Sequence, residues 1–320
     1  MNAYRITVVF LLVFCTLTTN AQALRLPAFT VVPLGTEGGI HENNLSAYML
    51  AVDGTNEYVC LDAGTLHAGI QRAIDKNVFE TDAGTVLKKY IKGYCISHPH
   101  LDHVAGLIIN SPEDSAKYIY AMPYCIDVLK DNYFTWKSWA NFGNEGDKPA
   151  LGKYQYVALS ANKEVSVENT ELYVTPFVLS HSNPYRSTAF LIRRKEDYFL
   201  YLGDTGADTI EHANNLLELW KAVAPLIKAR QLRAIAIEVS FPNEQPEKQL
   251  FGHLTPRLLM QELQKLGALT GEAALRNFPI MITHMKPPAD KEARIIKELR
   301  ADNPLDVKLV FPRQGKPLRF

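Results

Sequence analysis

Residues 97–106 read "SHPHLDHVAG" and follow the apolar run "GYCI". Three histidines and an aspartate of this stretch, His98, His100, Asp102 and His103, fall within six positions. In an extended segment, side chains two residues apart point to the same face, so His98 and His100 can hold one metal ion together. Asp102 and His103 lie past the turn and can reach a second ion. Imidazole and carboxylate groups suit zinc and similar divalent metals. The alternative is a polar surface loop, which would rarely place four ligand-type side chains directly after a buried strand.

Three further ligand-type residues stand at the ends of predicted strands. "FVLSH" ends in His181, "YFLYLGD" in Asp204 and "IMITH" in His284. Loops at one edge of a sheet can converge on one point, where rigid strands hold the ligands. Taken alone, each of these residues could be a capped strand end. Together with the histidine-rich stretch they predict two metal sites that share Asp204, whose carboxylate would bridge two dications about 3.5–4 Å apart. The first site comprises His98, His100 and His181, and the second comprises Asp102, His103 and His284.

The rest of the chain alternates strand-like and helix-like segments. "SAYMLAVD" and "EYVCLDAG" are separated by "GTN", which is typical of a β-hairpin. "NLLELWKAVAPLIKARQ" and "PRLLMQELQKLGAL" have the apolar spacing of helices. We therefore predict one domain of mixed α/β layers over residues 24–320. Residues 131–152, rich in aromatic residues, asparagine and glycine, form either a loop that covers the substrate or a surface insertion.

The N-terminal 23 residues have the pattern of a secretory signal peptide. Arg5 precedes an apolar run from Ile6 to Leu17, and small residues follow, with cleavage expected after Ala21 or Ala23. The apolar run is shorter than the roughly 20 residues that span a bilayer, so we expect no stable membrane insertion after cleavage. The sequence thus predicts a periplasmic or secreted protein.

Composition and cysteine content narrow the class of protein further. The chain has 320 residues, with 34 basic and 34 acidic side chains, and this balance argues against a nucleic-acid binder. Three cysteines, Cys60, Cys95 and Cys125, remain after signal cleavage. Their odd number and irregular spacing favour buried free thiols over a disulfide framework.

The longer stretch "HPHLDHVAGLIINSP", residues 98–112, resembles the signature of the class II 3′,5′-cyclic-nucleotide phosphodiesterases within the metallo-β-lactamase superfamily. "GDTG", "GHLTP" and "THMKP" are also similar to segments of that family, and the likeness covers nearly all of the mature chain. The resemblance implies a four-layer αββα sandwich and a dinuclear zinc centre. It also implies hydrolysis of cAMP or cGMP to the 5′-monophosphate. Members of the family commonly pair, so a homodimer is one alternative, but the sequence does not give the oligomeric state.

The resemblance extends to two residues outside the ligand set. Phosphodiesterases of the superfamily place a histidine near the metals in a segment like "GHLTP", paired with an acidic residue on the preceding strand. His253 and Glu238 match this pattern. We expect His253, oriented by Glu238, to protonate the departing 3′ oxygen, while Asp102 ligates metal and holds the attacking water. A capping histidine and a solvent-facing glutamate are the alternative.

Two other functions remain open on the sequence. Lactonases and other phosphodiesterases of the superfamily share most of these ligands, and a non-catalytic metal-binding protein could keep the fold. Asp204 together with "GHLTP" favours a phosphodiester substrate, because β-lactamases of this fold commonly use cysteine in place of that aspartate. The expected partner is therefore a small cyclic nucleotide and not a nucleic acid. The sequence does not distinguish cAMP from cGMP.

Overall fold

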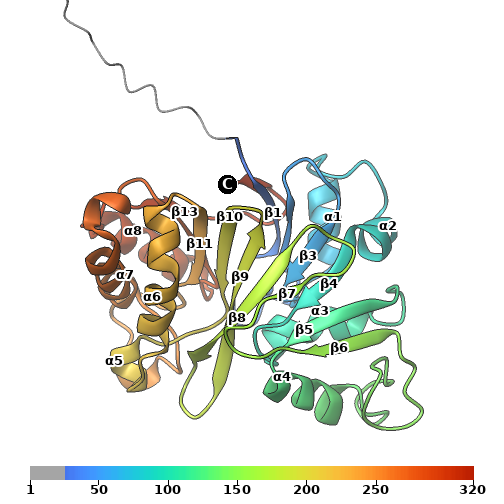
Figure 1. Ribbon diagram of the computed structural model, residues 1–320. Helices are drawn as coiled ribbons and strands as arrows, with labels where there is room; N and C mark the ends of the chain where they lie inside the picture. Colours follow the sequence, from blue (N-terminus) through green and yellow to red (C-terminus); the bar gives the residue numbers. More distant parts are fainter. Residues whose placement is uncertain (1–25) are drawn as a thin grey trace, which may run out of the picture.

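The computed structural model describes residues 26–320, so the predicted signal peptide lies outside the described residues. Two sheets pack face to face, and helices cover the outer face of each sheet (Figure 1). This is the αββα sandwich that the family resemblance implied. Among the described residues, no helix is both long and apolar enough to cross a membrane.

The first sheet contains the amino-terminal half of the fold. Its strands β3, β4, β5 and β6 are parallel, whereas β2 pairs antiparallel with both β1 and β3. The predicted hairpin at "GTN" is thus confirmed. In spatial order the sheet consists of β14 (Leu318–Arg319), β1 (Phe29–Gly35), β2 (Ala47–Val52), β3 (Tyr58–Leu61), β4 (Ile91–Cys95), β5 (Lys117–Ala121) and β6 (Tyr154–Ala158).

The second sheet contains most of the carboxy-terminal half. Strands β10, β11, β12 and β13 are parallel, and β7, β8 and β9 add an antiparallel side. In spatial order the sheet consists of β13 (Lys308–Val310), β12 (Pro279–Thr283), β11 (Leu232–Glu238), β10 (Asp197–Leu202), β9 (Arg186–Arg194), β8 (Tyr173–Ser180) and β7 (Val165–Ser166).

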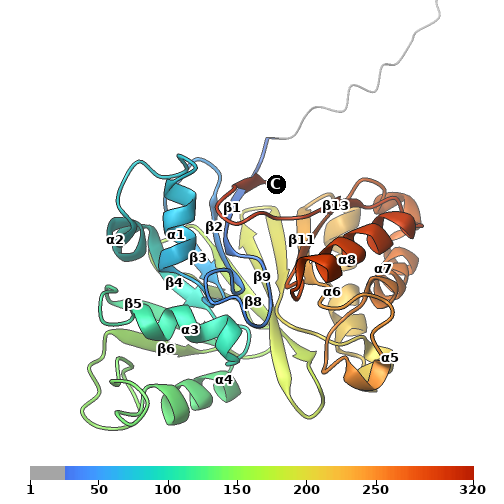
Figure 2. The ribbon, with the colours of Figure 1, turned by 180° about the vertical axis from the view of Figure 1, so that it is seen from behind.

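Helices form the two outer layers, and the view from behind shows them on opposite sides of the paired sheets (Figure 2). The first sheet is covered by α1 (His67–Ile74), α2 (Ala83–Thr85) with its continuation η1 (Val86–Tyr90), α3 (Leu101–Asn110), and α4 (Pro123–Val128) with its continuation η2 (Leu129–Tyr133). The second sheet is covered by α5 (Asp208–Glu211), α6 (Asn215–Lys228), α7 (Pro256–Thr270) and α8 (Ala289–Ala301), with the short turns η3 (Glu247–Gln249) and η4 (Glu272–Ala274).

The alternation of side chains along each strand divides the core among these layers. On β2, Met49 packs under the helices of the first sheet, whereas Tyr48 and Leu50 face the second sheet. On β11, Ile235 packs under the helices and Ala236 faces the first sheet. Strands that are buried on both faces have nearly continuous apolar sequences, which is the pattern seen in this chain.

The predicted cysteine state is confirmed for the described residues. Cys60, Cys95 and Cys125 are free and buried. Each packs as a small apolar side chain within the core of the first sheet or between the two sheets. These thiols are therefore part of the packing and not of a disulfide framework.

Candidate metal centre

The sheet topology explains why residues far apart in the sequence meet. Strands β8, β10, β11 and β12 all run in the same direction, so their carboxyl ends lie at one edge of the second sheet. His181, Asp204 and His284 follow three of these strands, and Glu238 is the last residue of the fourth. The stretch 97–106 follows β4 of the facing sheet and enters α3, which begins at Leu101. Two sheet edges therefore converge on one point.

The first predicted ligand set has the spacing of metal ligands. His98 Nε2 lies 3.0 Å from His100 Nδ1, which lies 3.3 Å from His181 Nε2. Nitrogen atoms about 2.0–2.1 Å from a tetrahedral zinc ion are separated by about 3.3 Å. These three side chains and Asp204 form one group of donor atoms that could hold a metal ion.

The second predicted set has similar spacing. His284 Nε2 lies 3.2 Å from Asp102 Oδ2. Donor atoms of Asp102, His103 and His284 all lie within 4.8 Å of one another, close enough to bind one ion. Asp204 Oδ1 lies 3.3 Å from His103 Nε2, while Asp204 Oδ2 lies 3.3 Å from His284 Nε2 and 3.6 Å from His98 Nε2. The one carboxylate of Asp204 thus borders both sets, in the position expected for a bridging ligand.

Contacts on the far side of the rings orient the histidines. In four of them Nδ1 is engaged by the protein, which leaves Nε2 facing the centre. The Nδ1 partners are Ser97 Oγ for His98 (3.0 Å), Asp62 Oδ2 for His103 (2.8 Å), Gly252 O for His181 (2.9 Å) and Ser240 Oγ for His284 (2.9 Å). Such outer contacts are usual for metal-ligating imidazoles. His103 Nε2 is buried without a hydrogen-bond partner among the described residues, which fits a nitrogen that binds metal.

Asp62 is the main residue of the centre that the sequence analysis did not identify. Its fully buried carboxylate accepts hydrogen bonds from the Ser97 N–H (2.7 Å), the Ser97 hydroxyl (2.7 Å), the Tyr201 hydroxyl (2.7 Å) and His103 Nδ1 (2.8 Å). The one signal in the sequence was an acidic residue that ends the apolar run "YVCLD". Buried charges require such partners, so this position indicated a polar network.

The electrostatic environment keeps two of the rings neutral. Burial lowers the pKa of His98 well below its usual value and lowers the pKa of His181 to about 4. Burial acts in the same direction on His103, but the carboxylates of Asp204 and Asp62 outweigh it and raise the pKa of that ring. A neutral imidazole has the lone pair that a metal ligand needs, so His98 and His181 suit that role without losing a proton.

His253 and Glu238 lie together beside the ligands. Glu238 is buried, so the alternative of a solvent-facing glutamate is wrong; its Oε1 accepts from His253 Nδ1 at 2.7 Å. His253 Nε2 lies 2.9 Å from Nζ of Lys286, a residue that the sequence analysis quoted within "THMKP" without giving it a role. A ring nitrogen of His253 also lies within 4.8 Å of donor atoms of Asp204 and His284, so these three residues form a third possible ligand set. Because His253 Nε2 lies beside the cationic Nζ of Lys286 and Nδ1 is bound to Glu238, a role beside the metals fits better than ligation.

The loop that joins β1 to β2 lies against the second ligand set. The Gly39 N–H donates to Asp102 Oδ2 at 2.9 Å. A Cβ atom on Gly38 would overlap the ring of His284, so the loop approaches that closely only because residue 38 is glycine. The backbone of this loop therefore helps to position two of the predicted ligands.

A cavity of about 390 Å³ adjoins the first ligand set. His98, His100 and His181 form its inner wall. Its outer wall consists of Pro99, Tyr124, Val128, Tyr133, Pro184, Tyr185 and Arg186. Tyr133 is the one residue of the stretch 131–152 that lines this cavity. Most of the stretch therefore lies away from the cavity, which fits a surface insertion better than a loop that covers the substrate.

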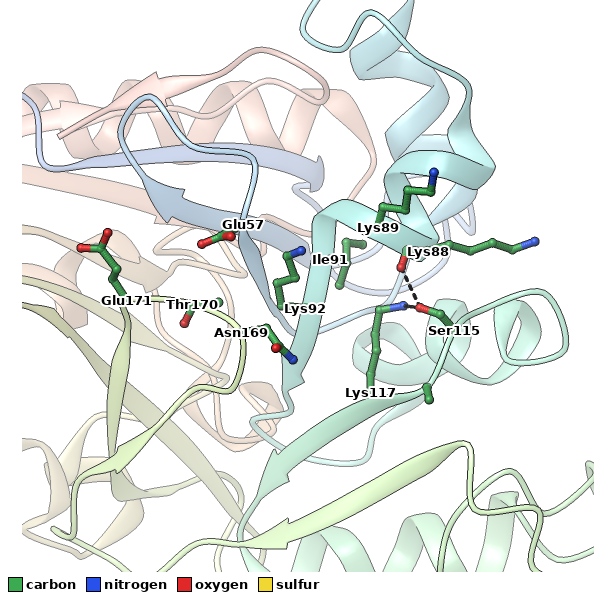
Figure 3. A pocket seen from close by; sticks show the side chains of 11 residues that line it. Glu57, Lys88, Lys89, Ile91, Lys92, Ser115, Lys117, Asn169, Thr170 and Glu171 are labelled. Carbon is green, nitrogen blue, oxygen red and sulfur yellow. Dashed lines mark hydrogen bonds between the residues drawn. The ribbon is translucent and has the colours of Figure 1, made fainter.

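A larger cavity of about 730 Å³ lies elsewhere and contains none of the predicted ligands. Lysines on η1, β4 and β5 line it together with the β7–β8 turn, and the lysine side chains point in different directions (Figure 3). Lys117 is already paired with the buried Asp114, and Lys88 lies 3.6 Å from Glu113. The geometry therefore favours the smaller cavity beside the histidines as the place where a substrate binds.

Comparisons with known proteins agree with this arrangement. A model of the class-II cAMP phosphodiesterase family matches residues 28–315. A 3′,5′-cyclic-nucleotide phosphodiesterase of Aliivibrio fischeri is 41% identical over 308 residues, which cover 92% of this chain and 93% of that protein.

Two solved structures show the fold. The crystal structure of unliganded yeast PDE1 has a TM-score of 0.80 at 24% identity and covers 92% of this chain and 100% of its own. The metallo-beta-lactamase fold protein YhfI from Bacillus subtilis has a TM-score of 0.61 at 15% identity, with the same coverage of 92% and 100%. The αββα sandwich of this chain is thus the metallo-β-lactamase fold.

Proposed function

The chain belongs to the family of class-II cAMP phosphodiesterases, and on that premise we propose that it hydrolyses 3′,5′-cyclic nucleotides to 5′-nucleoside monophosphates. The observation that carries the proposal is the convergence of two donor sets on the shared carboxylate of Asp204. Two observations support a metal at each set: His103 Nε2 is buried without a hydrogen-bond partner among residues 26–320, and the donor atoms are spaced 3.0–3.3 Å apart.

We propose two divalent ions, zinc by preference, because the donors are imidazole and carboxylate groups. Bound at these ligands, the ions would polarise the phosphoryl oxygens and make a water more acidic. His98, His100 and His181 would hold one ion, Asp102, His103 and His284 the other, and Asp204 both.

The protein's own groups then position the reactants. Asp102, fixed by the Gly39 N–H, lies at the edge of the second set, where it can hold the attacking water. The oxygen of this water joins phosphorus and one of its protons passes to solvent; the bond from phosphorus to the 3′ oxygen breaks, and that oxygen takes a proton. We assign this proton transfer to His253: its Nδ1 is held by Glu238, and its Nε2 would take a proton from the Lys286 ammonium, 2.9 Å away, and deliver it to the 3′ oxygen, after which solvent would return a proton to Lys286. The ammonium of Lys286 also brings a positive charge to the place where negative charge develops on the leaving group.

The experiment that tests this proposal is hydrolysis of cAMP and cGMP by the purified protein, with identification of the product as the 5′- or the 3′-nucleotide. Activity should disappear with a chelator and return when Zn²⁺ or another divalent ion is added. A lactone panel and bis-p-nitrophenyl phosphate run in parallel separate the alternatives. Metal-replete protein that opens lactones and leaves both cyclic nucleotides intact would overturn the proposal.

We also propose that the protein is exported, on the basis of the signal-like residues 1–23. Export would place the activity where it acts on nucleotides outside the cytoplasm. Cell fractionation and the mass of the mature protein test this idea, with cleavage expected after Ala21 or Ala23. Full-length protein found in the cytoplasmic fraction alone would contradict it.

A further inference from the structure

The cavity beside the first ligand set is lined by aromatic, apolar and cationic side chains as well as by the three histidines. It lies between α4, η2 and the turn that joins β8 to β9. Its volume of about 390 Å³ is within the range of pockets that enclose small molecules, about 300–1,000 Å³. A cyclic phosphate held at the ligands would leave its nucleoside to occupy this space.

Two tyrosine side chains, Tyr133 and Tyr185, line this cavity. Tyr133 is held in place because its hydroxyl donates to the carbonyl of Pro99 at 2.9 Å. Tyr185, on the turn, is 69% exposed and lines the cavity from the opposite element. Exposed aromatic rings that line a cavity are typical of sites that stack a nucleobase, since every base has a flat face.

Arg186 is the one cationic side chain of the cavity wall. Its guanidinium lies over the ring of Tyr124 at 4.9 Å, and the hydroxyl of Tyr124 is itself 2.7 Å from Thr188 Oγ1. Within residues 26–320, no carboxylate lies at ion-pair distance from Arg186. The guanidinium is thus oriented by stacking while its N–H donors are left without an acidic partner.

We propose that this cavity binds the purine base of the cyclic nucleotide, with Tyr133 and Tyr185 stacking on the base and Arg186 donating to its edge. This inference rests on the proposed function. A guanidinium has only donors, and the N7–O6 edge of guanine has two acceptors, whereas the matching edge of adenine has one acceptor and one donor. Arg186 therefore contributes more to the binding of cGMP than of cAMP.

The test replaces Arg186 by methionine, which keeps an unbranched apolar stem and removes the donors. Arg193→Met is the matched control, because Arg193 lies over Tyr173 at 4.3 Å on the same pair of strands but does not line the cavity. The specificity constant kcat/KM is measured for cGMP, cAMP and bis-p-nitrophenyl phosphate, which has no purine. Binding of 5′-GMP and 5′-AMP by calorimetry provides a readout that does not depend on turnover.

For Arg186→Met, the ratio of kcat/KM for cGMP to that for bis-p-nitrophenyl phosphate should fall about tenfold or more, and the ratio for cAMP by less. Tyr133→Leu should raise KM for both cyclic nucleotides, and Arg193→Met should change none of these ratios. An equal loss on all three substrates would mean that Arg186 acts on the phosphate, and would overturn the inference. Unchanged ratios in Arg186→Met would also overturn it. Wild-type protein that cleaves bis-p-nitrophenyl phosphate but no cyclic nucleotide would instead refute the proposed function.

Discussion

Asp62→Asn is a sharp test of how the centre is organised, because it changes one buried atom and keeps the shape of the side chain. Asp62 Oδ1 accepts from the Ser97 N–H, a donor that cannot reverse, so the amide oxygen of asparagine must stay at that position. The amide NH₂ then replaces Oδ2, which faces His103 Nδ1, the Ser97 hydroxyl and the Tyr201 hydroxyl. The hydroxyl groups can rotate and accept a hydrogen bond, but the imidazole can accept only by moving its proton.

The moved proton determines the size of the effect. With Nδ1 accepting from the new amide, His103 would carry its proton on Nε2, the nitrogen that faces Asp204 at 3.3 Å. A protonated Nε2 has no lone pair for a metal ion. Loss of such an outer contact typically weakens metal binding by about 10–100-fold, which is about 1.4–2.8 kcal/mol. We expect a weakening within this range at the second ligand set.

The assay is competition with a chromophoric chelator, together with nitrogen NMR shifts that report the tautomer of His103. Asp114→Asn is the matched control, because Asp114 is also buried, accepts from the hydroxyls of Tyr94 and Tyr154, and lies away from the ligands. The control should lose stability and keep its metal affinity. Equal metal affinity in wild type and Asp62→Asn, with the Nε2 tautomer present, would refute the reasoning.

Three further predictions concern other parts of the molecule. Gly38→Ala places a Cβ atom against the ring of His284 and should lower the bound metal measured by mass spectrometry, whereas Gly84→Ala, where only the side chain of Asp82 comes near, should not. Asp114→Ala leaves the ammonium of the buried Lys117 without its partner and should cost about 3–5 kcal/mol of unfolding free energy in urea titrations; a loss below about 1 kcal/mol would contradict this. Burial raises the pKa of the three core thiols, so little thiolate exists at pH 8. The thiols should therefore react with Ellman's reagent only after unfolding. Fast reaction in the native protein would contradict this prediction, because it would show that the thiols are accessible. These thiols are Cys60, Cys95 and Cys125.

Features that depend only on residues close together in the sequence could be predicted from the sequence alone. The spacing of His98, His100, Asp102 and His103 is local, so the geometry of a strand followed by a helix is enough to place them on a common side. Asp204 follows an apolar strand, and a residue that follows a strand lies at the edge of the sheet where that strand ends. Its place at the sheet edge was therefore predictable. Family resemblance then supplied the fold.

Other features join residues that no local pattern connects, and only the tertiary structure decided them. Asp62 meets His103 across 41 positions and Tyr201 across 139, and Lys286 meets His253 across 33. The cavity is lined both by Tyr133 of η2 and by Arg186 of the facing sheet. A single acidic, basic or aromatic residue is common at a strand end or on a surface, so its sequence position does not say which partner it has. The face-to-face packing of the two sheets selects that partner, and with it the orientation of each imidazole and the shape of the space left for a base.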